Sequence, residues 1–341
     1  LRLPGTGHSD YFLTYLGCVT KQQVPTDAGL RLNADIIEFC NEHLPRWVPV
    51  SIAGYNGADS GLNAPQELGA LFANAVEYLE EIKRRAKMPL EKAARACGGV
   101  SFRISMDVFE EASKLRAARL MWTQLLRDRY SITDPKVSNL RIHVVTAGSR
   151  MQYQQPLNNI VRGTLMGLTA VLGGVQSLGV SGYDEALSIP SEHAHQMSVR
   201  IQQILQEESN ITAVTDPLGG SHYVETLTAE LVERAWQFFD EIQEQGGFLR
   251  CLDSGRLHQK AAENQHKDFL AQAEGTQRIV GVTDHMDDVS PFEVDGFLGV
   301  DDAYDVALER LQAGRRERHE RAASSALRDL EHACRSEKNI M

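Results

Sequence analysis

The chain has 341 residues, of which 42% are hydrophobic and 24% are charged, and its formal net charge is −11. This composition is typical of a globular protein with enough apolar material for a large core. The negative charge argues against nucleic acid or an anionic membrane as the main partner. No apolar run approaches the ~20 residues needed to cross a bilayer and no signal peptide opens the chain, so we expect a cytoplasmic protein.

The five cysteines support the same location. They are odd in number, widely scattered and never in CxxC spacing, at Cys18, Cys40, Cys97, Cys251 and Cys334. This arrangement favours reduced thiols over disulfides or a zinc site.

Strand-like stretches alternate with helical patterns along the first part of the chain. The strand-like stretches are 1–7, 48–55, 100–105, 141–148 and 174–180. The stretch 48–55 is nearly all apolar, as expected of a parallel strand buried on both faces. Helices are predicted at 64–85, where Pro65 suits the first turn, and at 157–174, 190–209 and 224–247. This alternation predicts parallel βαβ units.

An open doubly wound sheet and a closed barrel both fit this alternation, and two features favour the barrel. Polar, glycine-containing turns follow almost every strand, which is where barrel enzymes build their active sites. No GxGxxG follows the first strand to indicate a dinucleotide site. We therefore predict a TIM-type (β/α)8 barrel. About five strands are recognisable where eight are needed, so we expect the others before Leu1 or on another chain.

The pattern changes from about residue 248. A helical stretch at 249–275 precedes a predicted short strand at 277–285 and an acidic loop, and the stretch 300–336 predicts two amphipathic helices that break near Gly314. We predict two regions, with residues 1–247 forming the C-terminal part of the barrel and 248–341 a mostly helical linker region.

The stretch SIAGYNGADSG at 51–61 indicates a ligand site. A strand runs into Tyr55 and Asn56, and Gly57, Asp59 and Gly61 surround the bend, although a bend that only reverses the chain needs one glycine. Polar residues lie on or follow the other strands too, and we expect them to meet at one mouth of the barrel. They are Thr6, His8, Asp10, Ser101, Arg103, His143, Thr146, Gly148, Gln176, Ser181, Asp184 and Glu185.

Each of these residues taken singly has an ordinary explanation. A histidine within a strand, such as His143, is more often a hydrogen-bonded core residue, and Ser181 or Asp184 suits a helix N-cap. The coincidence of five polar turns is what favours a site. Other chemistries have less support, because the two histidines of HAH at 193–195 lie on different faces of a helix and no GxSxG motif is present.

The segments NNIVRGTLMGLTAVLGGVQSLGVSGYDEALSIPSE and QQILQEESNITAVTDPLGGSHYVETLTAELVERA closely resemble the catalytic barrel of the coenzyme-B12-dependent acyl-CoA mutases. This is the family of methylmalonyl-CoA mutase and isobutyryl-CoA mutase, and the resemblance covers nearly the whole chain. It implies a barrel matched from about its fourth strand onward and then a helical linker. The family's separate cobalamin-binding domain has no counterpart in this sequence.

The resemblance implies substrate-contacting residues at the ends of the first two strands. A family pattern that reads GT-x-Q-ND and contacts the thioester aligns with Thr6 and His8, where His8 stands in place of Gln. A family GYH motif, whose His hydrogen-bonds the thioester carbonyl and takes part in catalysis, aligns with Tyr55 and Asn56.

Further substrate contacts are implied on the later strands. The family's Ser and Lys that touch coenzyme A match Ser101 and Lys136. An H-x-Q pair aligns with His143 and Val145, so His143 remains as a catalytic candidate and Val145 replaces the Gln.

The resemblance also implies residues that contact the cofactor, adenosylcobalamin. A Glu near the corrin becomes Asp59, and a Gly beside the corrin matches Gly148. The Asn and Glu that bind the adenosyl ribose align with Ser181 and Glu185, with Gln176 as a nearby Gln.

The departures from the family pattern bear on the substrate. The Arg that binds the free carboxylate of methylmalonyl-CoA falls at about Cys18, and a thiol has no fork of donors for a carboxylate. Asn56 can donate a hydrogen bond to a carbonyl but cannot transfer a proton. The resemblance therefore implies an adenosylcobalamin-dependent radical isomerase that acts on an acyl-CoA other than methylmalonyl-CoA.

Two alternatives are kept. One is a non-catalytic barrel subunit of a heteromeric mutase, which the changes at His8, Cys18, Asn56 and Val145 fit equally well. The other is a mutase for an acyl group not carried by coenzyme A, suggested by Gly99 where the family often has an Arg, although Lys136 argues against it. The implied partners are a separate cobalamin-binding subunit or domain, a second subunit in a dimer or heteromer, and a G-protein chaperone as a further candidate.

Overall fold

Short parallel strands form the centre of the structure, a computed structural model that describes residues 4–7, 9–10, 15–16, 24–286, 302–336 and 338–340. The strands are β1 (Gly5–Thr6), β2 (Trp47–Val48), β3 (Ile52–Ala53), β4 (Gly99–Ile104), β5 (Arg141–Thr146) and β6 (Ser177–Gly179). β1 pairs with β2, and the other four form a parallel sheet in the order β3-β4-β5-β6. All five strand-like stretches of the sequence therefore contain strands.

The stretch from Trp47 to Ala53 contains two strands. Its first strand, β2, pairs with β1, and its second strand, β3, pairs with β4. The ladder is interrupted at Pro49, which has no backbone N–H to donate. The prediction of one strand at 48–55 is thus wrong in two respects, because the stretch holds two short strands and ends at Ala53. Tyr55 and Asn56 belong to the short helix α3 (Gly54–Asp59).

Helices follow the strands as the alternation predicts. After α3 come α4 (Ala64–Arg85) and α5 (Leu90–Cys97) before β4, α6 (Val108–Tyr130) before β5, and the 3-10 turn η1 (Gly148–Arg150) with α7 (Asn158–Leu172) before β6. α8 (Glu192–Glu207), the 3-10 turn η2 (Ile211–Ala213) and α9 (His222–Glu244) follow β6, and α2 (Thr26–His43) precedes β2. The predicted helices at 64–85, 157–174, 190–209 and 224–247 are confirmed as α4, α7, α8 and α9.

The start of α4 shows how the sequence sets an element boundary. The side chain of Asn63 accepts a hydrogen bond from the backbone N–H of Gln66, and the Gln66 side chain accepts one from the Asn63 N–H, both at 3.2 Å. This reciprocal capping box satisfies two backbone donors that have no partner within the helix. Pro65 lies in the first turn, where its missing N–H costs nothing.

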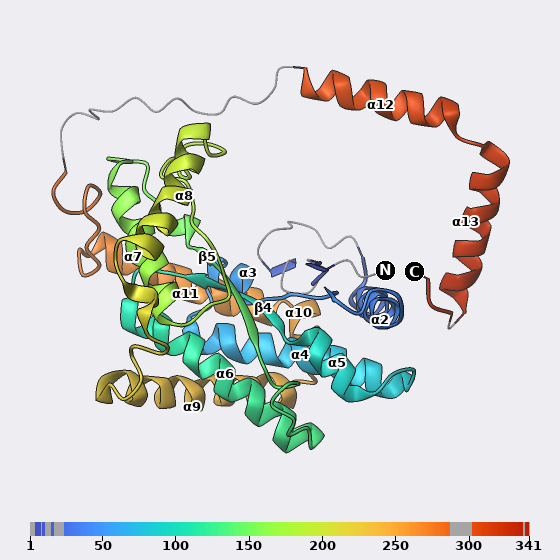
Figure 1. Cartoon of the computed structure of the whole chain (residues 1–341), viewed down its shortest axis with the longest axis horizontal. Coiled ribbons are helices and arrows are strands. Elements are labelled where there is room, and N and C mark those ends of the chain that lie inside the picture. Colours follow the sequence, from blue (N-terminus) through green and yellow to red (C-terminus); the bar gives the residue numbers. More distant parts are fainter. Residues whose placement is uncertain are drawn as a thin grey trace.

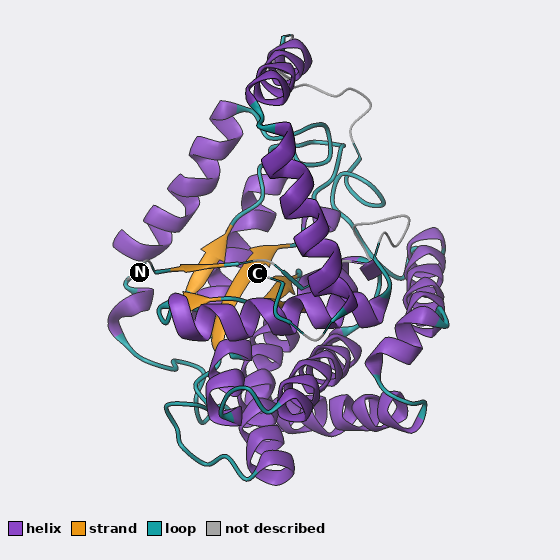
Figure 2. Cartoon of the chain, turned by 90° about the vertical axis from the view of Figure 1, so that its right-hand side faces the viewer, coloured by secondary structure: helices purple, strands orange, loops and turns teal. Residues whose placement is uncertain are grey.

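α4 and α6 cover one face of the sheet, and α9 packs against both on the outer side (Figure 1). Phe102 of β4 is fully buried in this layer together with Phe72 and Trp122, whose rings lie 6.1 Å apart. Gly69 lets α4 and α9 approach closely, because a Cβ at that position would lie 2.7 Å from the carbonyl oxygen of Ala235. The strands and this helical layer enclose the main core (Figure 2).

The observed architecture is an α/β fold with parallel strands and mostly helical content, which is consistent with the TIM-type barrel. Within the described residues, β3 and β6 are the edges of the four-stranded sheet. An eight-stranded closed barrel remains a prediction. In the described part of the chain, no helix has the length and apolar character that a membrane crossing requires.

The region after residue 247 differs in detail from the prediction. The helical stretch at 249–275 consists of α10 (Phe248–Asp253) and α11 (Arg256–Ala273), separated at Gly255, whose φ of 75° cannot continue a helix. The predicted strand at 277–285 is wrong, because Val280 and Asp284 form only an isolated bridge.

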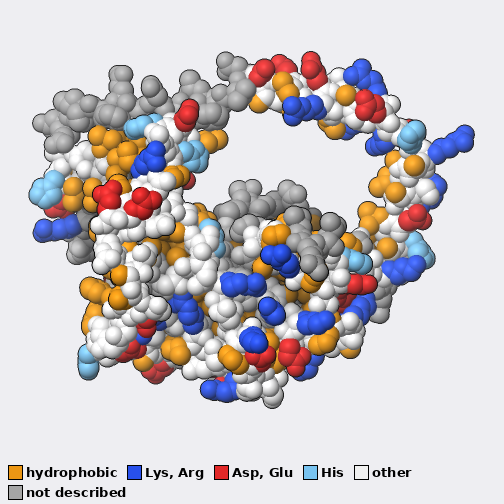
Figure 3. Space-filling view, viewed as in Figure 1, with side chains coloured by type: hydrophobic (Ala, Val, Ile, Leu, Met, Phe, Trp, Pro, Cys, Tyr) orange, Lys and Arg blue, Asp and Glu red, His pale blue; other side chains and the backbone are white. Residues whose placement is uncertain are grey.

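The last two helices are α12 (Ala303–Glu317) and α13 (Glu320–Arg335). The predicted break near Gly314 is wrong, because α12 continues through Gly314 and the chain becomes extended at Arg318. These helices stand apart from the sheet and the helices that cover it, with charged side chains over much of their surface (Figure 1 and Figure 3). The guanidinium of Arg31 in α2 donates to the carbonyls of Ala333, in the last turn of α13, and of Ser336, directly after it. The division of the chain at residue 247 remains a prediction.

A buried lysine fixes the carboxyl end of β4. The Nζ of Lys114 lies 2.7 Å from Glu67 Oε2, 2.6 Å from Glu111 Oε2 and 2.6 Å from the carbonyl oxygen of Arg103. The other carboxylate oxygens of Glu67 and Glu111 accept from the backbone N–H groups of Arg103 and Ser105. Burial opposes the charge on Lys114, but Glu111 and Glu67 outweigh it and raise the pKa of the lysine. The group therefore stays charged and ties β4 to α4 and α6.

Replacing Lys114 with Met should destabilise the protein by about 3–5 kcal/mol, because it leaves two buried carboxylates without their cation. The free energy of unfolding in urea measures the effect. The matched control is Lys83→Met, since Lys83 is 58% exposed and its ion pair with Glu80 spans 3.8 Å. That change should cost less than about 1 kcal/mol. Equal losses in the two variants would show that the buried cluster does not hold β4.

Cysteine reactivity should follow burial. Burial, with a contribution from Asp10, raises the pKa of Cys97 to about 12, whereas Cys334 is exposed. Only the thiolate reacts with iodoacetamide, so the native protein should be alkylated at Cys334 and not at Cys97 at mildly alkaline pH. Peptide mass spectrometry before and after unfolding in urea checks this. Labelling of Cys97 at the same rate in both states would contradict the buried position.

Candidate active site at the open face of the sheet

The face of the sheet opposite α4 and α6 carries residues in two paired rows, and we call it the open face. In the first row, Ser101 of β4 pairs with His143 of β5, which pairs with Ser177 of β6. In the second row, Arg103 pairs with Val145 and Val145 with Gly179. Residues paired in register point to the same side of a sheet. Ser101, His143 and Val145 therefore share one surface, as expected of a substrate path.

His143 lies in the middle of this surface. Its Nδ1 is 2.9 Å from the hydroxyl oxygen of Ser177, so the orientation of the imidazole ring is fixed from the neighbouring strand. Sequence alone left open whether His143 is a core histidine. It lies on the half-buried face, whereas the buried face of β5 is formed by Ile142, Val144 and Thr146.

Three of the predicted cofactor residues meet at the carboxyl end of the sheet. A Cβ on Gly148 would lie 3.2 Å from Cγ and from Oε1 of Glu185, so a larger residue at this position would press against this carboxyl group. Burial raises the pKa of Glu185, and the nearby Asp184 and Asp59 raise it further. Asp59 Oδ1 in turn accepts a hydrogen bond of 2.9 Å from the hydroxyl of Ser149. Asp59, Gly148 and Glu185 thus form one cluster, which we call the rim cluster.

Ser181 lies beside the rim cluster but its polar groups are used within the fold. Its backbone N–H donates to Thr146 Oγ1 at 2.8 Å, and its hydroxyl donates to the carbonyl of Thr146 at 2.9 Å. These bonds hold the turn after β6 against the end of β5. The N-cap explanation does not apply to Ser181, because the side chain at the N-cap of α8 is Ser191.

Lys136 and Gln176 lie at the other end of the sheet. Lys136 is exposed in the loop before β5, and the Gln176 side chain accepts from the Ile142 N–H at 2.7 Å, where β5 begins. A strand the length of β5 spans about 17 Å. The expectation that all the polar residues meet at one mouth is therefore wrong. The predicted residues instead extend along the open face, with Gln176 far from the other cofactor candidates.

Tyr55 and Asn56 line a smaller cavity between α3 and α11. It measures about 430 Å³, and Asp59, His258 and Gln265 also contribute to its wall. Asp59 connects this cavity to the rim cluster.

Of the residues predicted to contact substrate near the first strand, the structure describes only Thr6. Thr6 is exposed in β1, and both His8 and Cys18 lie outside the described residues. Asp10, another polar residue after this strand, is buried and accepts hydrogen bonds from the backbone N–H of Ala53, the amide of Asn74 and the hydroxyl of Tyr78. Its role is to hold β3, and it does not face a ligand.

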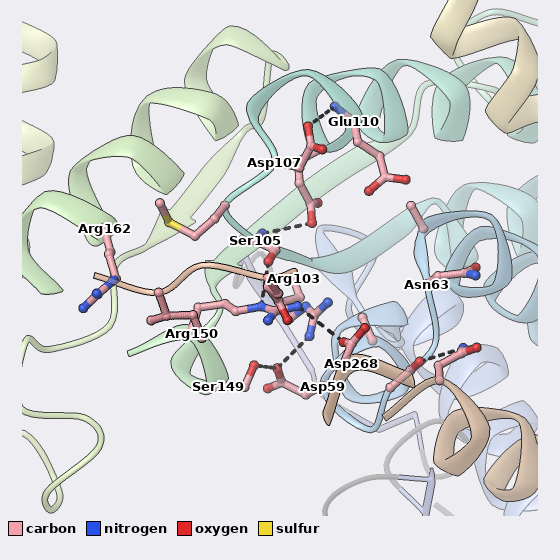
Figure 4. Close-up of a pocket in the computed structure, with 18 of the residues that line it drawn as sticks. Asp59, Asn63, Arg103, Ser105, Asp107, Glu110, Ser149, Arg150, Arg162 and Asp268 are labelled. Atoms are coloured by element: carbon pink, nitrogen blue, oxygen red, sulfur yellow. Dashed lines mark hydrogen bonds and ion pairs between the residues drawn. The ribbon is translucent and has the colours of Figure 1, made fainter. Parts of the chain in front are cut away.

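A larger cavity of about 760 Å³ opens beside the rim cluster (Figure 4). Several of its charged wall residues were not predicted as site residues, namely Arg150, Arg162, Glu110, Glu111, Lys114 and Asp268. Arg103 was noted in the sequence only as a polar residue on a strand. Its Nη1 lies 3.4 Å from Asp59 Oδ1, so it joins this cavity to the rim cluster. The sequence signal that could have identified these residues is that Arg103 lies on one strand and Arg150 follows the next strand along the chain.

Comparison with known proteins is consistent with this arrangement. The chain matches the family described as Methylmalonyl-CoA mutase over residues 1–341. A methylmalonyl-CoA mutase of Cereibacter sphaeroides is 35% identical over 321 residues, which cover 93% of this chain and 44% of that protein. The methylmalonyl-CoA mutase of Escherichia coli K12 is 33% identical over 344 residues, covering 100% of this chain and 47% of that protein.

A third relative carries a different name. The 2-hydroxyisobutanoyl-CoA mutase large subunit of Aquincola tertiaricarbonis is 31% identical over 343 residues, covering 100% of this chain and 60% of that protein. The chain thus spans about half the length of these relatives. The match over its whole length shows that the chain belongs to the methylmalonyl-CoA mutase family.

Proposed function

We propose that this chain forms the substrate-binding part of an adenosylcobalamin-dependent mutase that rearranges the carbon skeleton of an acyl-CoA. Membership of a family of CoA mutases supports the isomerase activity. The observation that carries the proposal is the arrangement of the predicted residues. The predicted substrate residues Ser101, His143 and Val145 share the open face, and this face leads to the rim cluster of predicted cofactor residues.

The chain's own residues have distinct roles in this proposal. Lys136 at the amino end and Ser101 on the open face hold coenzyme A. His143, oriented by Ser177, and Asn56 in α3 donate hydrogen bonds to the thioester carbonyl. Donors held by the fold orient the acyl group and exclude bulk water.

The rim cluster suits a large cofactor that approaches from the carboxyl ends of the strands. Gly148 leaves space in which the carboxyl group of Glu185 lies, and this carboxyl group accepts hydrogen bonds from ribose hydroxyls. Asp59 and Ser181 line the remainder of this proposed cofactor site. When bound, adenosylcobalamin supplies the radical chemistry of the rearrangement. Gln176 lies where β5 begins, away from Ser181 and Glu185, and its cofactor role stays a prediction.

The proposal includes partners. A cobalamin-binding subunit or domain supplies the cofactor, and the large-subunit name of the Aquincola relative supports a heteromeric assembly. A dimer, a G-protein chaperone and a cytoplasmic location belong to the same proposal. For the substrate, Cys18 in place of the family's Arg argues for an acyl-CoA other than methylmalonyl-CoA.

A second function, a non-catalytic barrel subunit with a structural role, is supported by a specific observation. Asn56 and Val145 stand where the family pattern has His and Gln, so two positions of the substrate path have lost hydrogen-bonding or proton-transfer capacity.

One experiment separates the two functions. The full-length protein is mixed with its cobalamin-binding partner, adenosylcobalamin and a panel of branched, hydroxylated and carboxylated acyl-CoAs, and mass spectrometry follows isomerisation. We expect at least one member to be rearranged, and His143→Ala to lower kcat/KM by about 10²-fold or more, since a lost oriented donor has effects of this order. Ser138→Ala, a change at a partly exposed residue in the loop before β5, is the control. No reaction and no cobalamin binding would support the structural role.

The rim cluster can be tested by cofactor binding alone. Gly148→Val places a branched side chain against Glu185 and should weaken adenosylcobalamin binding by about tenfold, or roughly 1.4 kcal/mol. The dissociation constant is measured by equilibrium dialysis with the cobalamin-binding partner present. Gly314→Val is the matched control, because no atom lies within 4 Å of a Cβ built at Gly314. Unchanged affinity in Gly148→Val would place the cofactor elsewhere.

A further inference from the structure

The two rows of the open face differ in chemistry. The first row presents two hydroxyl groups and an imidazole, from Ser101, His143 and Ser177. In the second row, Val145 of β5 pairs with Gly179 of β6, so neither position offers a side-chain hydrogen-bond donor or acceptor. Two residues along a strand separate the rows, a distance of about 7 Å. The open face therefore changes from polar to apolar over a short distance.

Arg103 ends the second row on the side of β4, but its charge is directed elsewhere. It pairs in register with Val145, and its Nη1 lies 3.4 Å from Asp59 Oδ1 in the rim cluster. Figure 4 shows its side chain among those that line the larger cavity. The part of the row over β5 and β6 is thus formed by a branched alkyl side chain and a glycine.

Gly179 leaves open space above β6. Among the described residues, a Cβ built at this position would meet only Val145 Cγ2 at 3.8 Å and the carbonyl oxygen of Val144 at 3.9 Å. Both are ordinary van der Waals distances, and the φ of Gly179 lies outside the left-handed region. The strand therefore does not require glycine here, and the missing side chain widens the open face beside Val145.

The opposite face of β6 is packed, which keeps this space open. A Cβ built at Gly167 of α7 would lie 3.6 Å from Val180 Cγ2 and 3.8 Å from Leu178 Cδ2, so both side chains fill the contact with α7. The backbone N–H and the hydroxyl of Ser181 bind Thr146 at the end of β5. Because β6 is held on these two sides, the space exists before a ligand binds and costs little to keep.

The position of the second row along the sheet indicates what occupies it. In the proposed function, His143 of the first row holds the thioester carbonyl, and the cofactor binds at the rim cluster beyond the second row. The carbon skeleton that is rearranged therefore lies between them. Resting on the proposed function, we propose that Val145 and Gly179 determine substrate specificity. The substrate class is an acyl-CoA whose acyl group is branched, wholly apolar and larger than isobutyryl.

Three thioesters test this because they differ by one substituent on the same carbon. Isobutyryl-CoA carries hydrogen there, pivaloyl-CoA a methyl group and 2-hydroxyisobutyryl-CoA a hydroxyl group. A methyl group above Gly179 gains apolar contact with Val145, and one more buried methylene increases affinity about fourfold. A hydroxyl group of the same size would find no partner in the side chains of the second row, and burying it unpaired weakens binding about tenfold relative to methyl.

Binding is measured without turnover by isothermal titration calorimetry. The full-length protein with its cobalamin-binding partner is titrated with coenzyme A and with the three thioesters. Pivaloyl-CoA should bind about fourfold more tightly than isobutyryl-CoA and about tenfold more tightly than 2-hydroxyisobutyryl-CoA. Equal binding of the methyl and hydroxyl forms would show that the row is not apolar, and the substrate class would be wrong.

Two variants assign the preference to the second row. Gly179→Leu fills the open space and should remove the advantage of pivaloyl-CoA over isobutyryl-CoA. Val145→Gln adds an amide and should reduce the difference between the methyl and hydroxyl forms to about twofold. Gly314→Leu is the matched control for added bulk, because among the described residues no atom lies within 4 Å of a Cβ built there. It should keep both preferences.

The affinity for free coenzyme A separates the possible failures. An affinity within about twofold of the unchanged protein shows that a variant is folded. If coenzyme A binds but pivaloyl-CoA has no advantage, or if Gly179→Leu keeps the advantage, the assignment of the second row is wrong and the proposed function stands. If neither coenzyme A nor any thioester binds, the proposed function fails and the assignment fails with it.

Discussion

Backbone groups at the ends of short parallel strands have no partner in the ladder, and in this chain buried side chains take them. Asp10 accepts from the N–H of Ala53 at the end of β3, and Glu67 and Glu111 accept from Arg103 and Ser105 at the end of β4. An unsatisfied buried donor costs about 1–3 kcal/mol, so each contact matters for strands of two to six residues. The sheet depends on these side chains for the position of its ends.

The same contacts determine what the open face presents. Lys114 balances the carboxylates that hold β4, and Gln176 and Thr146 hold the two ends of the β5–β6 pair. With both ends of the sheet fixed by the chain's own side chains, His143 meets Ser177 and Glu185 meets Gly148. A site that is already arranged before binding avoids much of the entropy cost of ordering it. The side chains that hydrogen-bond the backbone at the strand ends thus also position the residues of the proposed substrate path.

Much of the fold could be predicted from the sequence, and the failures have physical causes. The helix at 64–85 is confirmed because its Asn-Ala-Pro-Gln start and its apolar period agree. The helix α6 escaped notice because its buried face includes the charged residues Glu111 and Lys114, which hide the period. Arg103 was similarly undervalued, since nothing in a sequence shows that a strand arginine keeps free donors beside a cavity. The predicted strand 48–55 is too long. An apolar run does not reveal that Asp10, some 40 residues earlier in the chain, accepts the hydrogen bond of the Ala53 N–H and so ends the strand there.

Buried hydrogen-bond donors that have no partner help to distinguish an enzyme from a structural subunit. A subunit that only supports an assembly gains nothing from a guanidinium with free donors beside a cavity, because incomplete hydrogen bonding of a buried group is a cost to stability. Arg103 carries that cost next to the rim cluster, while below it Lys114 lies 2.7 Å from Glu67 and 2.6 Å from Glu111. The unpartnered Nε of Arg103 beside a cavity therefore favours a ligand-binding role for this part of the chain over a purely structural one.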